Sequence, residues 1–337
     1  MKKIILGFTM TVVVAAVLSN CKGNTSNTSD SASSQIAAGA VGGSSNDGAN
    51  GGTYASNAAF PKPTFAQKLE NAFNLLPLAH AFTFTCTASS ISPSSYTANQ
   101  SYVWTPASCS LAFKNGKSTS TAFTGTYTLN YNAACMGSGF GLATQSSGCV
   151  RTRTTTGSSG VVRTLTGVDG NSLSLTNDTT VPSGYDTSVV TSAGGNITTC
   201  TAGNCATRTI AISGSHASLS LTPSGGTATT LWDHTYSTLS SDPIAITGTG
   251  TTKVVNSGTI VVQHNIAKFT STAKVTTPLA FTISDCCFPA SGVITSTFTG
   301  GTFAAKTETL TFTSSCGEAT LIDSSGASSS VTLQHCL

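Results

Sequence analysis

The densest group of side chains that could carry chemistry is the run Trp-Asp-His-Thr-Tyr from Trp232 to Tyr236. On a strand, successive side chains alternate between two faces, so Trp232, His234 and Tyr236 would share one face and Asp233 would lie on the other. An aromatic stripe can stack on the apolar C–H face of a sugar ring. This pattern makes Trp232, His234 and Tyr236 candidate glycan-binding residues. The alternative is a strand that buries its aromatic side chains in the core.

Two arginines form a second candidate ligand site. Arg151 and Arg153 are two residues apart and would also share one strand face. Guanidinium groups bind carboxylates and other anionic groups through paired hydrogen bonds. We therefore predict that Arg151 and Arg153 could bind an anionic glycan, with a solvated strand face as the alternative.

Hydrolytic chemistry would need a histidine beside a carboxylate and a nucleophile. His234 and His264 are the candidate histidines, each with an aspartate as partner. A glycosidase-like carboxylate pair would use an aspartate or Glu308 and Glu318, although the strand pattern around both glutamates favours surface charge. No Gly-x-Ser-x-Gly, His-Glu-x-x-His or phosphate-binding glycine loop occurs. We predict no catalytic residue, no metal and no cofactor, and keep an exported hydrolase as the alternative function.

The elements that would position these residues are strands. From residue 81 onward, apolar residues alternate with threonines, as where Leu310 and Phe312 follow Glu308 at every second position. This period predicts antiparallel strands with one buried and one solvated face, and turn residues separate the strands at roughly 8–12 residue intervals. We predict an all-β fold over residues 81–337, either an antiparallel β-sandwich or a long β-meander. A boundary between two sheet halves would fall in residues 178–196.

One helical segment is predicted before the strands, over residues 60–80. The helix would begin at Thr64, which forms a capping-box pattern with Gln67, and would end before Pro77. We expect this helix to plug or cover one end of the sheet. Its apolar side would consist of four residues at helical spacing, namely Phe65, Leu69, Phe73 and Leu76.

The N-terminus has the features of an export signal. Residues 1–20 contain two lysines followed by an apolar run that is short for a transmembrane helix. The sequence Leu18-Ser19-Asn20-Cys21 resembles the lipobox of bacterial lipoproteins, in which a peptidase cleaves before the cysteine and the thiol carries diacylglycerol. The resemblance implies that Cys21 is lipidated. Lys22 stands where an aspartate would resemble an inner-membrane retention signal, which by analogy favours the outer membrane, with the periplasmic or surface-exposed face left open.

Residues 21–59 would then be the lipidated cysteine and a tether rich in Gly, Ser and Asn. A flexible chain of this length spans about 34 Å on average. The folded part could therefore stand clear of the lipid surface.

Cysteine usage supports export. The chain has 11 cysteines, and a lipidated Cys21 would leave an even number, which is typical of disulfide-bonded exported proteins. No pair of Cys-x-x-Cys motifs is present, which disfavours zinc. The spacing favours the local pairs Cys86–Cys109, Cys135–Cys149 and Cys200–Cys205. The adjacent Cys286 and Cys287 would each pair with Cys316 or Cys336. In chain order, the candidates are Cys86, Cys109, Cys135, Cys149, Cys200, Cys205, Cys286, Cys287, Cys316 and Cys336.

Composition limits the class of function. Only 8% of residues are charged, against roughly 25% in a typical soluble domain, while 59 Thr and 49 Ser supply hydroxyl groups. Without a basic stripe, nucleic acid is not expected as a partner. We predict a lipid-anchored cell-envelope protein of structural, adhesive or glycan-binding type. Its expected partners are the membrane, through the lipid, and a glycan or another envelope protein.

Overall fold

The computed structural model of the chain describes residues 82–87, 89–113, 118–156, 160–167, 169–179, 194–249, 252–283, 288–301 and 304–332. The predicted signal peptide, Cys21, the tether and the predicted helix lie outside these ranges. Within them the chain is almost entirely β-structure, as predicted. None of the helices in this part of the chain has the length and apolar character needed to cross a membrane.

The strands form one antiparallel sheet of 21 strands. Two short 3₁₀ helices interrupt them, η1 (Leu142–Thr144) and η2 (Gly203–Cys205). The strands are β1 (Phe82–Cys86), β2 (Ser90–Ser92), β3 (Ser101–Thr105), β4 (Cys109–Phe113), β5 (Ser118–Thr124), β6 (Tyr127–Tyr131), β7 (Val150–Thr155), β8 (Val161–Thr166), β9 (Ser172–Asp178), β10 (Gly195–Cys200), β11 (Thr207–Ser213), β12 (Ser215–Thr222), β13 (Thr229–Thr238), β14 (Ile244–Thr247), β15 (Lys253–Ser257), β16 (Thr259–His264), β17 (Phe269–Phe281), β18 (Ser291–Thr299), β19 (Thr307–Phe312), β20 (Glu318–Ile322) and β21 (Ser328–Thr332).

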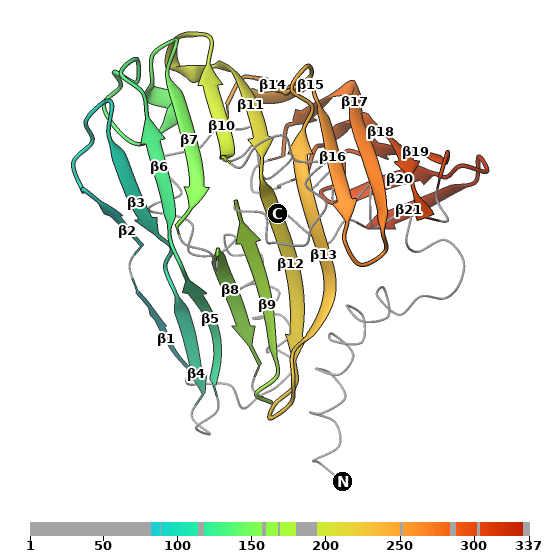
Figure 1. Cartoon of the computed structure of the whole chain (residues 1–337), viewed down its shortest axis with the longest axis horizontal. Coiled ribbons are helices and arrows are strands. Elements are labelled where there is room, and N and C mark those ends of the chain that lie inside the picture. The colour runs from blue at the N-terminus through green and yellow to red at the C-terminus, as the bar shows by residue number, and fades with distance from the viewer. Residues whose placement is uncertain are drawn as a thin grey trace.

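From β1 to β16 the chain crosses the sheet in long legs, each made of two consecutive strands. One strand of each leg lies in a lower row and the other in an upper row (Figure 1). Strand β17 spans both rows, because it pairs with β16 along its first half and with β15 near its end. The lower row is β1, β4, β5, β8, β9, β12, β13 and β16, and the upper row is β2, β3, β6, β7, β10, β11, β14 and β15.

Every leg pairs with the legs before and after it along the chain, so the sheet is an up-and-down meander. For example, β8 pairs with β9 and β5, while β7 of the same leg pairs with β10 and β6. Of the two architectures that the sequence left open, the strand pairing therefore shows the meander. The ladders also continue on both sides of residues 178–196, where a boundary between sheet halves was expected.

Glycines allow the legs to bend between the two rows. Gly125 lies between β5 and β6 with φ +83°, and Gly160 precedes β8 with φ +66°. Residues with a side chain rarely adopt a positive φ. In addition, neither glycine position has space for a Cβ atom. A Cβ on Gly125 would collide with the carbonyl oxygen of Gly160, and a Cβ on Gly160 with that of Asn177 on the next leg. The two bends are therefore packed against each other.

The largest core lies against β11 and β14 to β20. Because β11 and β20 are far apart in the order of strands, their contribution to one core means that the sheet curls around it. In β18 and β19, Ser or Thr positions alternate with the core residues, which is the pattern that the sequence predicted. The core residues are Ile210, Ile212, Ile244, Ile246, Val255, Ile260, Val262, Ala273, Val275, Leu279, Phe281, Phe288, Ile294, Leu310, Phe312, Ala319 and Leu321.

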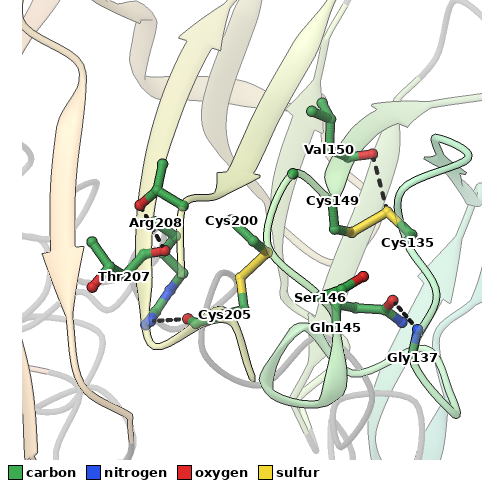
Figure 2. Close-up of a disulfide and its surroundings, with 12 residues drawn as sticks. Cys135, Gly137, Gln145, Ser146, Cys149, Val150, Cys200, Cys205, Thr207 and Arg208 are labelled. Carbon is green, nitrogen blue, oxygen red and sulfur yellow. Dashed lines mark hydrogen bonds between the residues drawn. A yellow bond between two sulfur atoms is a disulfide. The ribbon is translucent and has the colours of Figure 1, made fainter. Parts of the chain in front are cut away.

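A second, smaller core is braced by two disulfides, Cys135–Cys149 and Cys200–Cys205 (Figure 2). They close the β6–β7 and β10–β11 connections, and the two connections are joined because the amide of Cys200 donates to the carbonyl of Cys149 at 2.8 Å. Both predicted local pairs are confirmed. Leu142 of η1 fills the space beside them and is fully buried.

The other predicted disulfides are described only in part. Cys86 lies directly opposite Cys109 in the β1–β4 register, and the pairing of their side chains stays a prediction. Cys316 is disulfide-bonded. Its partner is not among the cysteines whose side chains the structure describes, and Cys286, Cys287 and Cys336 lie outside the described residues.

Candidate functional site

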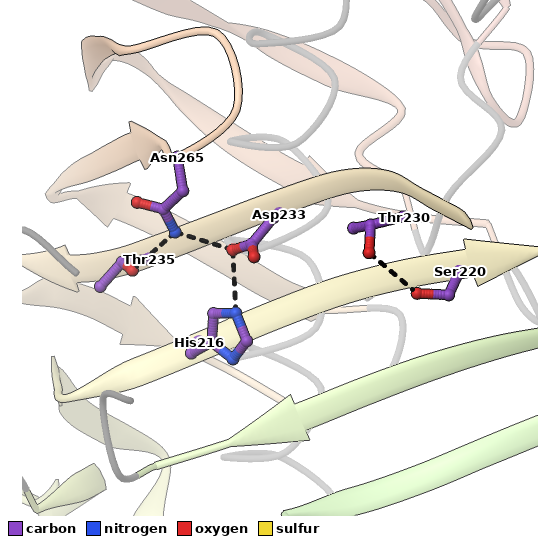
Figure 3. Close-up of polar contacts among 6 residues, drawn as sticks. All are labelled: His216, Ser220, Thr230, Asp233, Thr235 and Asn265. Carbon is purple, nitrogen blue, oxygen red and sulfur yellow. Dashed lines mark hydrogen bonds and ion pairs between the residues drawn. The ribbon is translucent and has the colours of Figure 1, made fainter. Parts of the chain in front are cut away.

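A polar cluster joins β12, β13 and the turn after β16 (Figure 3). His216 Nε2 lies 2.9 Å from Asp233 Oδ1, and Asn265 Nδ2 donates to the same oxygen at 2.8 Å. Asn265 Nδ2 also donates to Thr235 Oγ1 at 3.0 Å, and its backbone amide donates to the carbonyl of Asp233 at 2.9 Å. Because a carboxylate only accepts, Nε2 of His216 carries a proton in this contact.

The strand register explains why these residues meet. His216 of β12 pairs with Thr235 of β13, which places Asp233 two positions along on the same face. The cluster is mostly buried: His216 is 5% exposed and Thr235 is fully covered. A carboxylate that is largely shielded from water needs partners for its charge, and the half-buried Asp233 has them in His216 and Asn265.

Two more histidines, one from β13 and one from β16, meet on the opposite face of the sheet. His234 pairs with His264 of β16, and their rings meet edge-to-face with centroids 4.4 Å apart. His264 also stacks on Phe269, with centroids 4.0 Å apart. The alternation along β13 thus separates Asp233 from His234, and the histidine that contacts Asp233 is His216, which the sequence did not single out.

Burial sets the charge of these two rings. It lowers the pKa of His234 to about 4, an effect that Asp233 opposes and His216 reinforces. Burial, together with His234, lowers the pKa of His264 to about 2. Both imidazoles are therefore neutral at pH 7.

The predicted ligand-binding residues divide between two regions. Trp232 lies in β13 opposite Leu219, and its side chain lies outside what the structure describes. Tyr236 and Arg153, from β13 and β7, come close enough for their charges to interact. Burial raises the pKa of Tyr236, the Arg153 guanidinium opposes that shift, and the Tyr127 ring of β6 adds to it.

Arg153 also belongs to an aromatic stack that the sequence did not reveal. Its guanidinium lies over the Tyr127 ring, 5.0 Å from the centroid, and Tyr127 stacks on Trp104 of β3 at 5.2 Å. All three side chains are half-buried. The Trp104 Nε1 group has no hydrogen-bond partner among the described residues. We call Trp104, Tyr127 and Arg153 the aromatic–arginine stack.

Arg151 lies deeper than the sequence indicated. It is 1% exposed, so the alternative of a solvated arginine face is wrong for this residue. Arg208, which is also fully buried, has its pKa lowered to about 10, chiefly by its own burial and further by the charge of Arg151. Arg208 Nη1 donates to the carbonyls of Cys205 at 3.1 Å and Gly248 at 2.8 Å, and Figure 2 shows the first contact beside the disulfide.

The two glutamates considered for a carboxylate pair do not come together. Glu308 and Glu318 lie at opposite ends of the β19–β20 ladder. Glu318 is exposed, whereas Glu308 is 1% exposed, so the prediction of surface charge is wrong for Glu308. Within the described ranges, no three His, Cys, Asp or Glu side chains are placed to hold a metal ion.

These arrangements favour different chemistry. An Asp–His contact can orient an imidazole for general-base catalysis, but His216 is nearly covered and Asp233 is shared with Asn265. The aromatic–arginine stack is half-buried and offers flat rings and a cation to a ligand. No protein-family model, curated protein sequence or solved structure matches the chain.

Proposed function

We propose that the chain is an exported, lipid-anchored protein of the outer membrane with a binding, adhesive or structural role. The observation that carries this proposal is the pair of closed disulfides, Cys135–Cys149 and Cys200–Cys205. Disulfides persist in oxidising compartments and are rare in the cytosol. The lipobox-like sequence ending at Cys21 supplies the anchor in this proposal, and residues 21–59 supply the tether.

Lipidation is tested by expressing the full chain in a bacterial host with a radiolabelled fatty acid. We expect label in the native chain and none in a Cys21→Ser variant, and globomycin should block signal-peptide cleavage of the native chain. A Ser19→Ala variant serves as the matched control and should be labelled. Processing that ignores globomycin, together with an unmodified Cys21 thiol, would overturn the anchor.

The ligand class that the site favours is a glycan with a carboxylate. Trp104 and Tyr127 present stacked rings, and Arg153 adds a cation that can bind a carboxylate. Tyr236, which packs against the largest core, interacts electrostatically with the same guanidinium. This site keeps two of the predicted residues, Arg153 and Tyr236, and replaces the single-strand stripe with residues from β3, β6, β7 and β13.

Glycan binding is tested on an array with the secreted, unlipidated chain. We expect binding to uronic-acid or sialic-acid glycans, and a loss of about 10- to 150-fold in affinity for Arg153→Ala, since a charge-assisted contact contributes about 1.5–3 kcal/mol. Lys274→Ala, a surface cation on β17, is the control. Equal binding by both variants would exclude the aromatic–arginine stack as the site.

The second candidate is an exported hydrolase, favoured by the 2.9 Å contact between His216 and Asp233. If this pair is catalytic, esterase or glycosidase activity of the secreted chain should fall at least about a hundredfold in His216→Ala. Activity that is absent from the native chain, or unchanged in the variant, would exclude this pair from catalysis.

A further inference from the structure

The lower row of strands carries an apolar face whose side chains remain partly exposed. Directly paired residues on neighbouring strands share a face, and the pairs Leu165–Leu173, Leu173–Leu221 and Leu175–Leu219 run across β8, β9 and β12. Phe123 of β5 joins them through its pairing with Arg163 of β8. We call this surface the leucine face; its apolar residues are Phe123, Leu165, Leu173, Leu175, Leu219 and Leu221.

The leucine face differs from the core in its exposure. Its residues are half-buried except Leu165, which is 40% exposed, whereas the core isoleucines are almost fully covered. The main contacts of β8 are with β5 and β9, and those of β9 are with β8 and β12, which are the strands hydrogen-bonded to them. A contiguous apolar surface of this kind marks a docking site.

One cation lies within this apolar surface. Arg163 pairs with Leu175 on one side and Phe123 on the other, and its guanidinium is 6.0 Å from the centre of the Phe123 ring. Its Nε group is buried and has no hydrogen-bond partner among the described residues. Desolvation lowers the pKa of Arg163. A partner that covers the face would therefore need an acid at this position.

The segment just before β1 has the matching properties. Residues 64–76 contain Phe65, Leu69, Phe73 and Leu76 at helical spacing, and Glu70 is the only acidic residue in 60–81. On a helix, Glu70 lies about 100° from Leu69, at the edge of the apolar stripe. We propose that residues 64–76 form a helix that docks on the leucine face, with Glu70 paired to Arg163.

The lengths are compatible with this docking. A helix of this length is about 20 Å long. It could lie across β4, β5, β8 and β9, because neighbouring strands are about 4.8 Å apart. Residues 77–81 can span about 17 Å, and they lead directly into Phe82 of β1, which pairs with β4 at the edge of the same row.

Charge reversal tests the Glu70–Arg163 pair by hydrogen exchange on the mature chain. Glu70→Arg and Arg163→Glu each place like charges together, so amide exchange in residues 161–166 and 172–178 should rise roughly tenfold. The double variant should restore the native rate. Lys68→Glu, on the other flank of the stripe, is the control and should leave exchange unchanged. Failure of the double variant to restore protection overturns the pair.

Photo-crosslinking tests the location of the helix directly. With p-benzoylphenylalanine in place of Phe73, we expect intramolecular crosslinks to peptides that contain residues 161–175 or 219–221. The same probe at Asn71, on the opposite side of the helix, should give none. Crosslinks between two chains would assign the leucine face to a second copy, and crosslinks to other strands would place the helix elsewhere; either result overturns the proposal.

Discussion

The imidazole rings of His234 and His264 face each other across β13 and β16, with centroids 4.4 Å apart, and both are almost fully buried. Burial lowers the pKa of His234 to about 4 and that of His264 to about 2. The folded protein therefore holds two neutral imidazoles side by side. This pair couples the stability of the sheet to pH.

We expect the free energy of unfolding to fall as the pH drops from 6.5 towards 4. In this range the unfolded chain binds a proton at each histidine and the folded chain does not, so acid favours unfolding. The lowered pKa of His234 corresponds to about 3 kcal/mol lost by pH 4, and His264 contributes about as much over the same range. Urea unfolding at a series of pH values measures this slope.

The double variant His234→Phe, His264→Phe separates these two rings from other acid-sensitive groups. Its free energy of unfolding should decline less steeply between pH 6.5 and 4 than that of the native chain. If the slopes coincide, the two histidines are not the source of the acid sensitivity.

The Asp233 carboxylate should contribute to stability rather than stand ready for a substrate. In Asp233→Ala, the His216 Nε2 and Asn265 Nδ2 donors lose their common acceptor, and a buried unsatisfied donor costs about 1–3 kcal/mol. We expect thermal unfolding to show a loss in this range. Thr230→Ala on the same strand removes a 3.4 Å hydroxyl contact with Ser220 at an exposed position (Figure 3), and should cost less than about 0.5 kcal/mol. Equal losses in the two variants would contradict the assignment.

Adding even one methyl group at a bend of the legs should lower the free energy of unfolding. Gly125→Ala adds a Cβ that collides with the carbonyl of Gly160, at a residue with φ +83°. We expect a loss of at least about 2 kcal/mol in urea unfolding, from the positive φ and the clash together. Gly139→Ala is the control, because a Cβ there meets nothing within 4 Å. A stable Gly125→Ala variant would mean that the bend can relax.

Local patterns predicted the strands well. Alternation around Leu310 and Phe312 places both in the core, and the spacing of Cys135 from Cys149 and of Cys200 from Cys205 gave the correct pairs. Each of these features depends on residues close together in the chain. The period of a strand and the closure of a short loop are local properties.

The site depended on strand order, which local patterns do not contain. Trp104 meets Tyr127 only because β3 pairs with β6, and Arg153 of β7 interacts with Tyr236 of β13 although these two strands are not paired. His216 finds Asp233 through the β12–β13 register. Glu308 was expected at the surface because a charge on a strand is usually solvated, but the curled sheet buries that end of β19.

The two disulfides should stabilise the braced end of the sheet to different extents. Cys135–Cys149 closes a connection with a sequence separation of 14, and Cys200–Cys205 one of 5. In the chain-entropy treatment the longer loop contributes about 3 kcal/mol and the shorter about 2 kcal/mol. Replacing both cysteines of each pair with serine should therefore lower the free energy of unfolding in urea more for the first pair than for the second. Since the two connections share the Cys200–Cys149 backbone hydrogen bond, the losses should not be additive in the fourfold variant. Strictly additive losses would show that the two disulfides brace the sheet independently.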